Sequence, residues 1–115
     1  MSDWKTQSCQ SVREVSVMPS AEVDSVLAQL PGWKTSLDGK RMVRYWKVKH
    51  FVAGIEFFRR VAELAEAEDH HPDLHLEGYR QVRIESWTHS VGGISVKDLI
   101  LAAKIDELPV ELFDA

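Results

Sequence analysis

Pro72 sets a fixed boundary in the middle of the chain, because proline ends a helix at or near the residue before it. The residues that precede it carry apolar side chains at helical spacing, which predicts a helix from about Phe51 to Asp69. His70 and His71 therefore lie where this helix ends. Side chains at such a place are held by a rigid element and still face a loop, which is a common setting for chemistry.

The part of the chain before this helix predicts another helix and a hairpin. Ser20 is the expected N-cap of a helix whose apolar stripe runs to Leu30. Asp38-Gly39 then lies between two extended segments, and this pair is a strong hairpin signal because both residues tolerate a positive φ. This predicts two antiparallel strands, at residues 33–37 and 40–48.

The part after Pro72 predicts a second pair of strands and a last helix. Leu74 to Leu76 is a short strand candidate, and the longest strand runs from Tyr79 to His89. On that strand one face is expected to carry Val82, Ile84, Ser86 and Thr88. The last helix begins at Ser95, with Asp98 three residues later in a capping box.

This order predicts an α+β fold with the elements helix, strand, strand, helix, strand, strand, helix. Hairpin connections favour a four-stranded antiparallel sheet with three helices packed on one face. We expect residues 20–115 to form the domain and residues 1–19 to form an N-terminal tail, in which Trp4 is the only large anchor.

Composition excludes several classes of protein. The chain has 14 Lys and Arg against 18 Asp and Glu, and its net charge of −4 argues against direct nucleic-acid binding. A single cysteine, Cys9, excludes an internal disulfide and fits a reducing compartment. No signal peptide and no apolar run of the ~20 residues that a membrane span requires is found, so we expect a cytoplasmic protein without membrane contact.

The candidate site is a cluster of histidines between positions 70 and 89, namely His70, His71, His75 and His89. Imidazole titrates near neutral pH, so such a cluster suits proton chemistry or metal binding. Glu66 and His70 share a helical face, although a histidine at a helix C-terminus is also favoured by the helix dipole alone. No cysteine pair and no helix with His-x-x-x-His spacing supports zinc, and we expect no metal.

Two further residues have alternative interpretations. Asp98 is most simply a helix cap. Trp87 is a stacking platform for a flat ligand or, on the simpler interpretation, a core or interface aromatic.

The arrangement as a whole resembles the pterin-4a-carbinolamine dehydratase family. The family motif is an acidic residue, then His-His-Pro, an aromatic residue, Thr-His, a glycine turn and an aspartate. In this chain the matching positions are Glu66, His70-His71-Pro72, Tyr79, Thr88-His89, Gly92-Gly93 and Asp98. The resemblance runs from Ser20 to about Leu108. It implies the same four-stranded sheet with three helices, and assembly into homodimers or tetramers.

The resemblance also implies a reaction, the removal of water from a carbinolamine on a pterin ring, with no cofactor. His70, His71 and His89 would then be the catalytic residues, since imidazoles suit its acid–base steps. The residues implied to bind or orient the substrate and the histidines are Glu66, Trp87, Thr88 and Asp98.

One segment departs from the family pattern. Active members usually place tryptophan and asparagine among five positions after His-His-Pro, whereas residues 73–78 of this chain number six and contain neither. An extra residue shifts the register of a short strand, which would reshape or close the pterin pocket.

The departing segment and the sequence around Trp87 resemble a subgroup linked to RuBisCO assembly in plants, algae and carboxysome-bearing bacteria. We therefore expect a RuBisCO assembly factor or chaperone with weak or lost catalysis, a carboxysome-associated protein with RuBisCO subunits as partners. The alternative is an active dehydratase in tetrahydropterin recycling. A third interpretation is a dimerisation cofactor of transcription factors, which is a second role known in the family.

Overall fold

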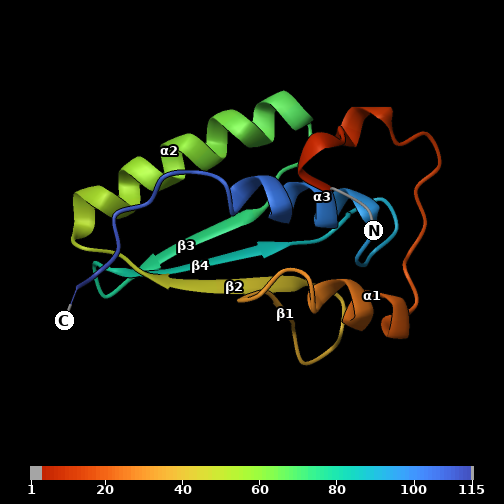
Figure 1. Ribbon diagram of the computed structural model, residues 1–115, viewed down its shortest axis with the longest axis horizontal. Coiled ribbons are helices and arrows are strands. Elements are labelled where there is room, and N and C mark those ends of the chain that lie inside the picture. The colour runs from red at the N-terminus through yellow and green to blue at the C-terminus, as the bar shows by residue number, and fades with distance from the viewer. Residues whose placement is uncertain (1–3, 115) are drawn as a thin grey trace.

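The computed structural model describes residues 4–114, and in this range it contains three α-helices and one four-stranded sheet (Figure 1). The helices are α1 (Ser20–Leu27), α2 (Phe51–Glu68) and α3 (Val96–Ile105). The strands are β1 (Lys34–Thr35), β2 (Met42–Lys47), β3 (Asp73–Glu77) and β4 (Gln81–Ser86). They lie in the order β1-β2-β4-β3, each antiparallel to its neighbour. The predicted α+β class and element order are confirmed.

The helices share one core on one face of the sheet. Strands alternate their side chains between two faces, and on the inward face Met42 of β2 and Ile84 of β4 are fully buried. Trp46 is the central aromatic residue, with its ring in edge contact with Trp33 at 5.9 Å and Phe57 at 5.1 Å between centroids. The opposite face carries charged residues and is not covered by a helix (Figure 1).

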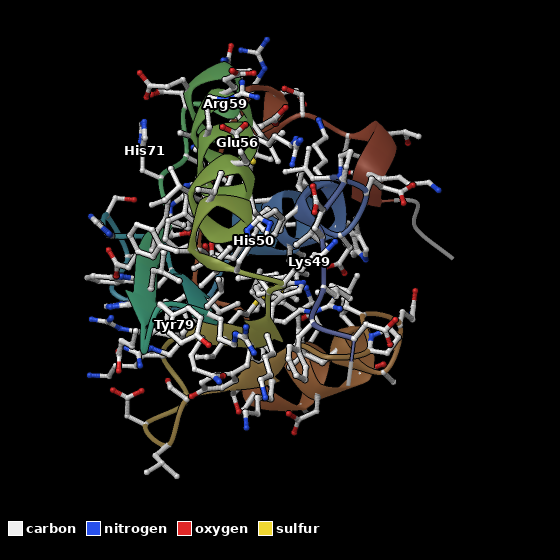
Figure 2. The ribbon with its side chains drawn as sticks, turned by 90° about the vertical axis from the view of Figure 1, so that its left-hand side faces the viewer. Lys49, His50, Glu56, Arg59, His71 and Tyr79 are labelled. Atoms are coloured by element: carbon white, nitrogen blue, oxygen red, sulfur yellow. The ribbon has the colours of Figure 1, made fainter. Side chains whose placement is uncertain are left out.

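Helix α2 is closed at both ends by local hydrogen bonds. His50 is its N-cap, with Nδ1 accepting from the Ala53 N–H. At the other end Asp69 takes a left-handed conformation with φ of 53°, and the His70 N–H donates to the Ala65 carbonyl. Pro72 follows, so the chain leaves the helix there and His71 projects from its end at the surface (Figure 2).

Both predicted ends of the first helix, α1, are wrong. Ser20 is the first helical residue of α1 rather than its N-cap, because Pro19 takes the extended N-cap position. The regular helix ends at Leu27, since the chain then continues to Leu30 in tighter three-residue turns.

The hairpin between β1 and β2 forms as expected, although its turn is longer than a two-residue turn. Only Gly39 takes a positive φ, of 72°, in this loop of the described chain. Asp38 instead accepts hydrogen bonds from the Ser36 hydroxyl and the Lys40 N–H, which stabilise the loop.

The second pair of strands is regular, with β3 paired to β4 at each residue from Asp73 to Glu77. The predicted strand Tyr79–His89 is too long at both ends, since β4 runs from Gln81 to Ser86. Tyr79 lies in the connecting turn with φ of 54°, next to Gly78 with φ of 53°, and His89 lies in the segment after the strand.

Residues 4–11 contain two short 3-10 turns, Trp4–Thr6 and Cys9–Ser11, and Cys9 is fully buried. No helix within residues 4–114 is long and apolar enough to cross a membrane.

Candidate functional site

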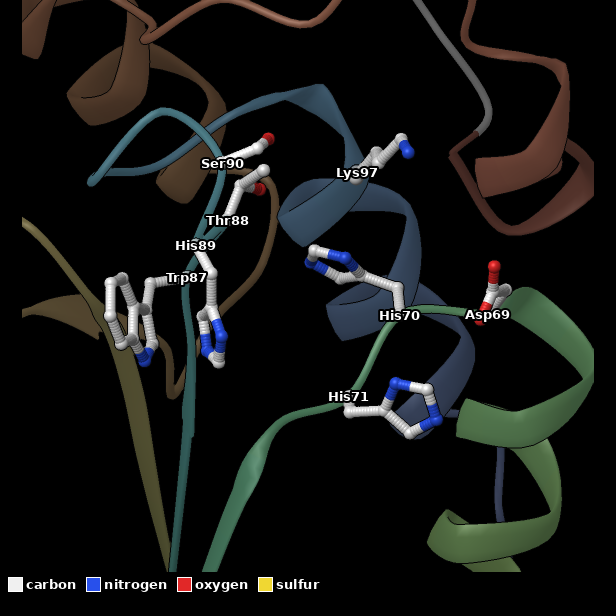
Figure 3. A pocket seen from close by; sticks show the side chains of 8 residues that line it. All are labelled: Asp69, His70, His71, Trp87, Thr88, His89, Ser90 and Lys97. Atoms are coloured by element: carbon white, nitrogen blue, oxygen red, sulfur yellow. The ribbon is translucent and has the colours of Figure 1, made fainter.

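The segments after α2 and after β4 meet over the start of α3 and enclose a cavity of about 220 Å³ (Figure 3). His70 and His71 come from the first segment and His89 from the second, so the structure brings the predicted catalytic histidines together. The cavity is open to solvent although residues 73–78 depart from the family pattern. The lining residues are Asp69, His70, His71, Trp87, Thr88, His89, Ser90 and Lys97.

His70 is the buried member of this group, and Asp98 lies behind it. The Nε2 atom of His70 is 2.7 Å from Oδ1 of Asp98, whose side chain is 0% exposed. A carboxylate acceptor at Nε2 holds the proton on that nitrogen, which leaves the lone pair of Nδ1 for a molecule in the cavity. Asp98 therefore does not line the cavity but orients a residue that does.

Asp98 is itself fixed by three further donors, which come from β4, from the segment after it and from the N-cap of α3. Its Oδ1 accepts from the Ser86 hydroxyl at 2.6 Å, and its Oδ2 accepts from the Thr88 hydroxyl at 2.8 Å and the Ser95 N–H at 2.9 Å. The last bond completes the predicted capping box of α3. Because each donor is buried, this carboxylate is held in one orientation, and His70 with it.

His71 is held differently. Its Nε2 atom is 2.5 Å from Oε2 of Glu66, one turn back on α2, and the two side chains are 56% and 75% exposed. An exposed pair of this kind orients the ring only weakly. His71 can therefore exchange protons with solvent while it faces the cavity.

His89 lies against Trp87, with ring centroids 4.1 Å apart and an angle of 38° between the planes (Figure 3). Trp87 is fixed in turn by Asp73, which accepts its indole N–H at 3.2 Å, and by the Arg41 guanidinium, 4.9 Å from the ring centroid. The indole thus forms one wall of the site and supports a histidine.

Several residues of the site were not identified from the sequence. Ser86 carries a visible signal, since it is a polar residue among the inward-facing apolar positions of β4. Asp69, Ser90 and Lys97 line the cavity but follow no pattern that distinguishes them from surface residues.

His75 of the predicted cluster does not reach the cavity. It lies on the other face of the sheet, 3.8 Å from a carboxylate oxygen of Glu85. Within residues 4–114, no group of three or more His, Cys, Asp or Glu side chains is placed to hold a metal ion.

Comparison with known proteins gives a consistent result. A family model described as pterin 4 alpha carbinolamine dehydratase matches residues 16–108. The chain is 43% identical over 115 residues to the mitochondrial pterin-4-alpha-carbinolamine dehydratase 2 of Arabidopsis thaliana, a match that covers 96% of this chain and 62% of that protein. It thus spans less than two thirds of the length of that relative.

Two shorter proteins are matched over most of their length. A Halorhodospira halophila protein provisionally named as the same dehydratase is 42% identical over 95 residues, which cover 82% of this chain and 85% of that protein. A Brucella melitensis crystal structure described as a transcriptional coactivator/pterin dehydratase superposes with a TM-score of 0.73 at 29% identity. That match covers 78% of this chain and 95% of the other.

Proposed function

The chain belongs to the pterin 4 alpha carbinolamine dehydratase family, and on that premise we propose that it dehydrates a 4a-hydroxytetrahydropterin. The observation that carries this proposal is the convergence of His70, His71 and His89 on one open cavity, with His70 fixed by Asp98. This geometry favours an active enzyme over the inactive scaffold that the departure at 73–78 suggested.

The reaction requires one proton to be given and one to be taken. The C–O bond to the leaving hydroxyl breaks as that oxygen gains a proton and departs as water. The adjacent ring nitrogen loses its proton, and its electron pair forms the new C=N bond. We assign the removal of the nitrogen proton to Nδ1 of His70, because Asp98 holds the other ring proton at Nε2.

We assign the proton for the leaving hydroxyl to His71. Glu66 stabilises the protonated imidazole, and the exposure of the pair allows His71 to regain its proton from solvent. Trp87 and His89 present flat ring surfaces to the cavity, which suits a planar pterin.

The test is steady-state dehydration of a 4a-hydroxytetrahydropterin by wild type, His70→Ala and His71→Ala. His75→Ala is the matched control, since His75 lies close in sequence but outside the cavity. We expect losses of at least about 100-fold for the first two variants and a rate close to wild type for the control. A wild-type rate no higher than buffer would refute the proposal.

A second candidate function, assistance to RuBisCO assembly in the cytoplasm or carboxysome, is supported by a different observation. Asp73, in the segment that departs from the family pattern, accepts hydrogen bonds from Trp87 and from Arg41, which also contacts Glu85. This charged network lies on the sheet face that the helices leave uncovered, where a RuBisCO subunit would have access. Co-expression should then raise the yield of assembled RuBisCO, and Arg41→Ala should reduce the gain; an unchanged yield excludes this role.

We also propose that the chain forms homodimers, and that dimers pair into tetramers. Sedimentation velocity of the purified protein distinguishes the monomer, the dimer and the tetramer. A monomer at micromolar concentration would contradict this assembly.

A further inference from the structure

Residues 4–11 precede the part of the chain that the family model matches, yet they pack against both elements that support His70. The thiol of the buried Cys9 donates to the Lys97 carbonyl in the first turn of α3 at 3.4 Å. The Gln10 side-chain amide donates to the Ala67 carbonyl, at the end of α2, at 2.7 Å. The segment Ser8–Ser11 therefore bridges the end of one helix and the start of the other.

Glu68 is the anchor of this bridge. Its side chain is buried, with Oε1 accepting the Cys9 N–H at 2.8 Å and Oε2 accepting from Lys104 Nζ at 2.7 Å. Burial alone would raise the pKa of Glu68, but the hydrogen bonds from Lys104 and from Cys9 outweigh it, and the pKa lies below its ordinary value. Glu68 thus remains a carboxylate, which binds the segment by charge-assisted hydrogen bonds.

The state of the Cys9 side chain agrees with its role as a donor. Burial raises the pKa of the Cys9 thiol to about 12, and the nearby Glu68 carboxylate adds to the effect. The side chain therefore keeps its proton at neutral pH and can donate it to the Lys97 carbonyl.

The contacts fall next to the two partners of the central hydrogen bond of the site. Glu68 is two residues before His70, and Lys97 is one residue before Asp98. We propose that the segment Ser8–Ser11 sets the relative position of His70 and Asp98, and that Glu68 and Cys9 are positioning residues of the site. This inference rests on the proposed dehydration only for its kinetic test.

The expected size of the effect follows from geometry. The His70–Asp98 bond joins α2 to α3, and a shift between the two helices would displace Nδ1 of His70 in the cavity. Misplacement of a catalytic group by 1 Å costs up to about 100-fold in rate. Loss of one of several supports should give a smaller shift, and we expect a decrease in kcat of about tenfold.

The test uses the full chain and compares Glu68→Ala, Glu68→Gln and Gln7→Ala. Glu68→Ala removes the acceptor for Cys9, whereas Glu68→Gln keeps one acceptor oxygen for Cys9 but loses the charge and the acceptor for Lys104. Gln7→Ala is the control, an exposed residue just before the segment Ser8–Ser11. We expect kcat to fall about tenfold in Glu68→Ala with KM changed less than about twofold, and to fall less in Glu68→Gln.

A second readout is independent of activity. The ring proton of His70 that binds Asp98 is shielded from solvent, so we expect a slowly exchanging downfield proton resonance, assigned by its loss in His70→Ala. We expect this resonance to shift or broaden in Glu68→Ala and to be unchanged in Gln7→Ala. If Glu68→Ala does not fold, Cys9→Ala and Gln10→Ala take its place, each removing one bond of the bridge.

The outcomes separate the two proposals. If Glu68→Ala, measured well below its melting temperature, keeps the wild-type kcat and the wild-type His70 resonance, the positioning role is overturned, whatever the stability of the variant. A wild type without dehydration would overturn the proposed function alone, because the His70 resonance would still decide this inference.

Discussion

His70 and His71 are adjacent in the chain and belong to the same site, but they are held in opposite ways. The His70 side chain is 9% exposed and bonded to an aspartate with no exposure, whereas the His71 side chain is 56% exposed and bonded to a glutamate that is 75% exposed. The partner of His70 comes from α3, while the partner of His71 lies on α2, one turn back.

Because of this difference, the two carboxylates, Asp98 and Glu66, should contribute differently to the stability of the fold. A buried carboxylate with several donors is costly to perturb, because each donor left without an acceptor stays buried. An exposed ion pair contributes little to stability, since water replaces either partner. Asp98 should therefore affect both folding and catalysis, and Glu66 should affect catalysis alone.

The largest expected effect is that of Asp98→Asn. An amide nitrogen in place of one oxygen would face two buried donors, so bonds to Asp98 are lost and His70 loses its fixed orientation. We expect the dehydration rate to fall at least about 100-fold and the free energy of unfolding to fall by about 3 kcal/mol. Steady-state kinetics and urea denaturation measure the two, with Asp38→Asn in the exposed hairpin loop as control. A variant with nearly full activity would mean that Asp98 is only a cap.

Glu66→Gln should change catalysis without changing stability. The neutral amide no longer stabilises a protonated His71, and we expect the rate to fall about tenfold. Because the side chain is exposed, the free energy of unfolding should stay within about 0.5 kcal/mol of wild type. A clear loss of stability in the same urea titration would contradict the contrast between the two carboxylates.

Thr88→Val tests the support of Asp98 from the segment after β4. Valine keeps the shape of threonine but loses the hydroxyl that bonds Asp98 at 2.8 Å and Ser95 Oγ at 2.6 Å. We expect a loss of about 1–2 kcal/mol in the free energy of unfolding and a rate about threefold lower. Thr35→Val in β1 is the matched control, and equal losses in both variants would remove the special role of Thr88.

The smallest expected effect on stability concerns a third carboxylate, Glu68, and it depends on pH. Its pKa in the folded protein lies below the ordinary value of 4.5, so the unfolded chain binds more protons near that pH. The contribution of Glu68 to the free energy of unfolding is therefore fully present above pH 4.5. It is lost as the pH falls through the pKa that Glu68 has in the folded protein. Glu68→Gln should flatten the dependence of the melting temperature on pH below about 5; an unchanged slope would contradict the assignment.

The fold was predictable where the sequence carries local signals. Pro72 marks the end of α2, and Ser95 with Asp98 marks the start of α3, since caps and breakers act within a few residues. The prediction of Ser20 as an N-cap was wrong because Pro19 takes that position, without a side-chain hydrogen bond.

The site was predictable in its residues and less so in its geometry. The family resemblance identified the histidines that line the cavity. His75 belongs to the same cluster of histidines in the sequence, but it lies on the other face of the sheet, because side chains alternate along β3. The docking of Cys9 could not be foreseen, since it depends on a contact with Lys97, 88 residues away, and no periodic pattern records it.

The position of Asp98 in the last helix also has a consequence for how the protein is made. Synthesis proceeds from the N-terminus, so α2 and His70 leave the ribosome before the carboxylate that orients them. Cys9, which is made before α2, finds its partner Lys97 only when α3 appears. The cavity is therefore organised only after α3 has been made, and a nascent chain without α3 carries the histidines but no organised site.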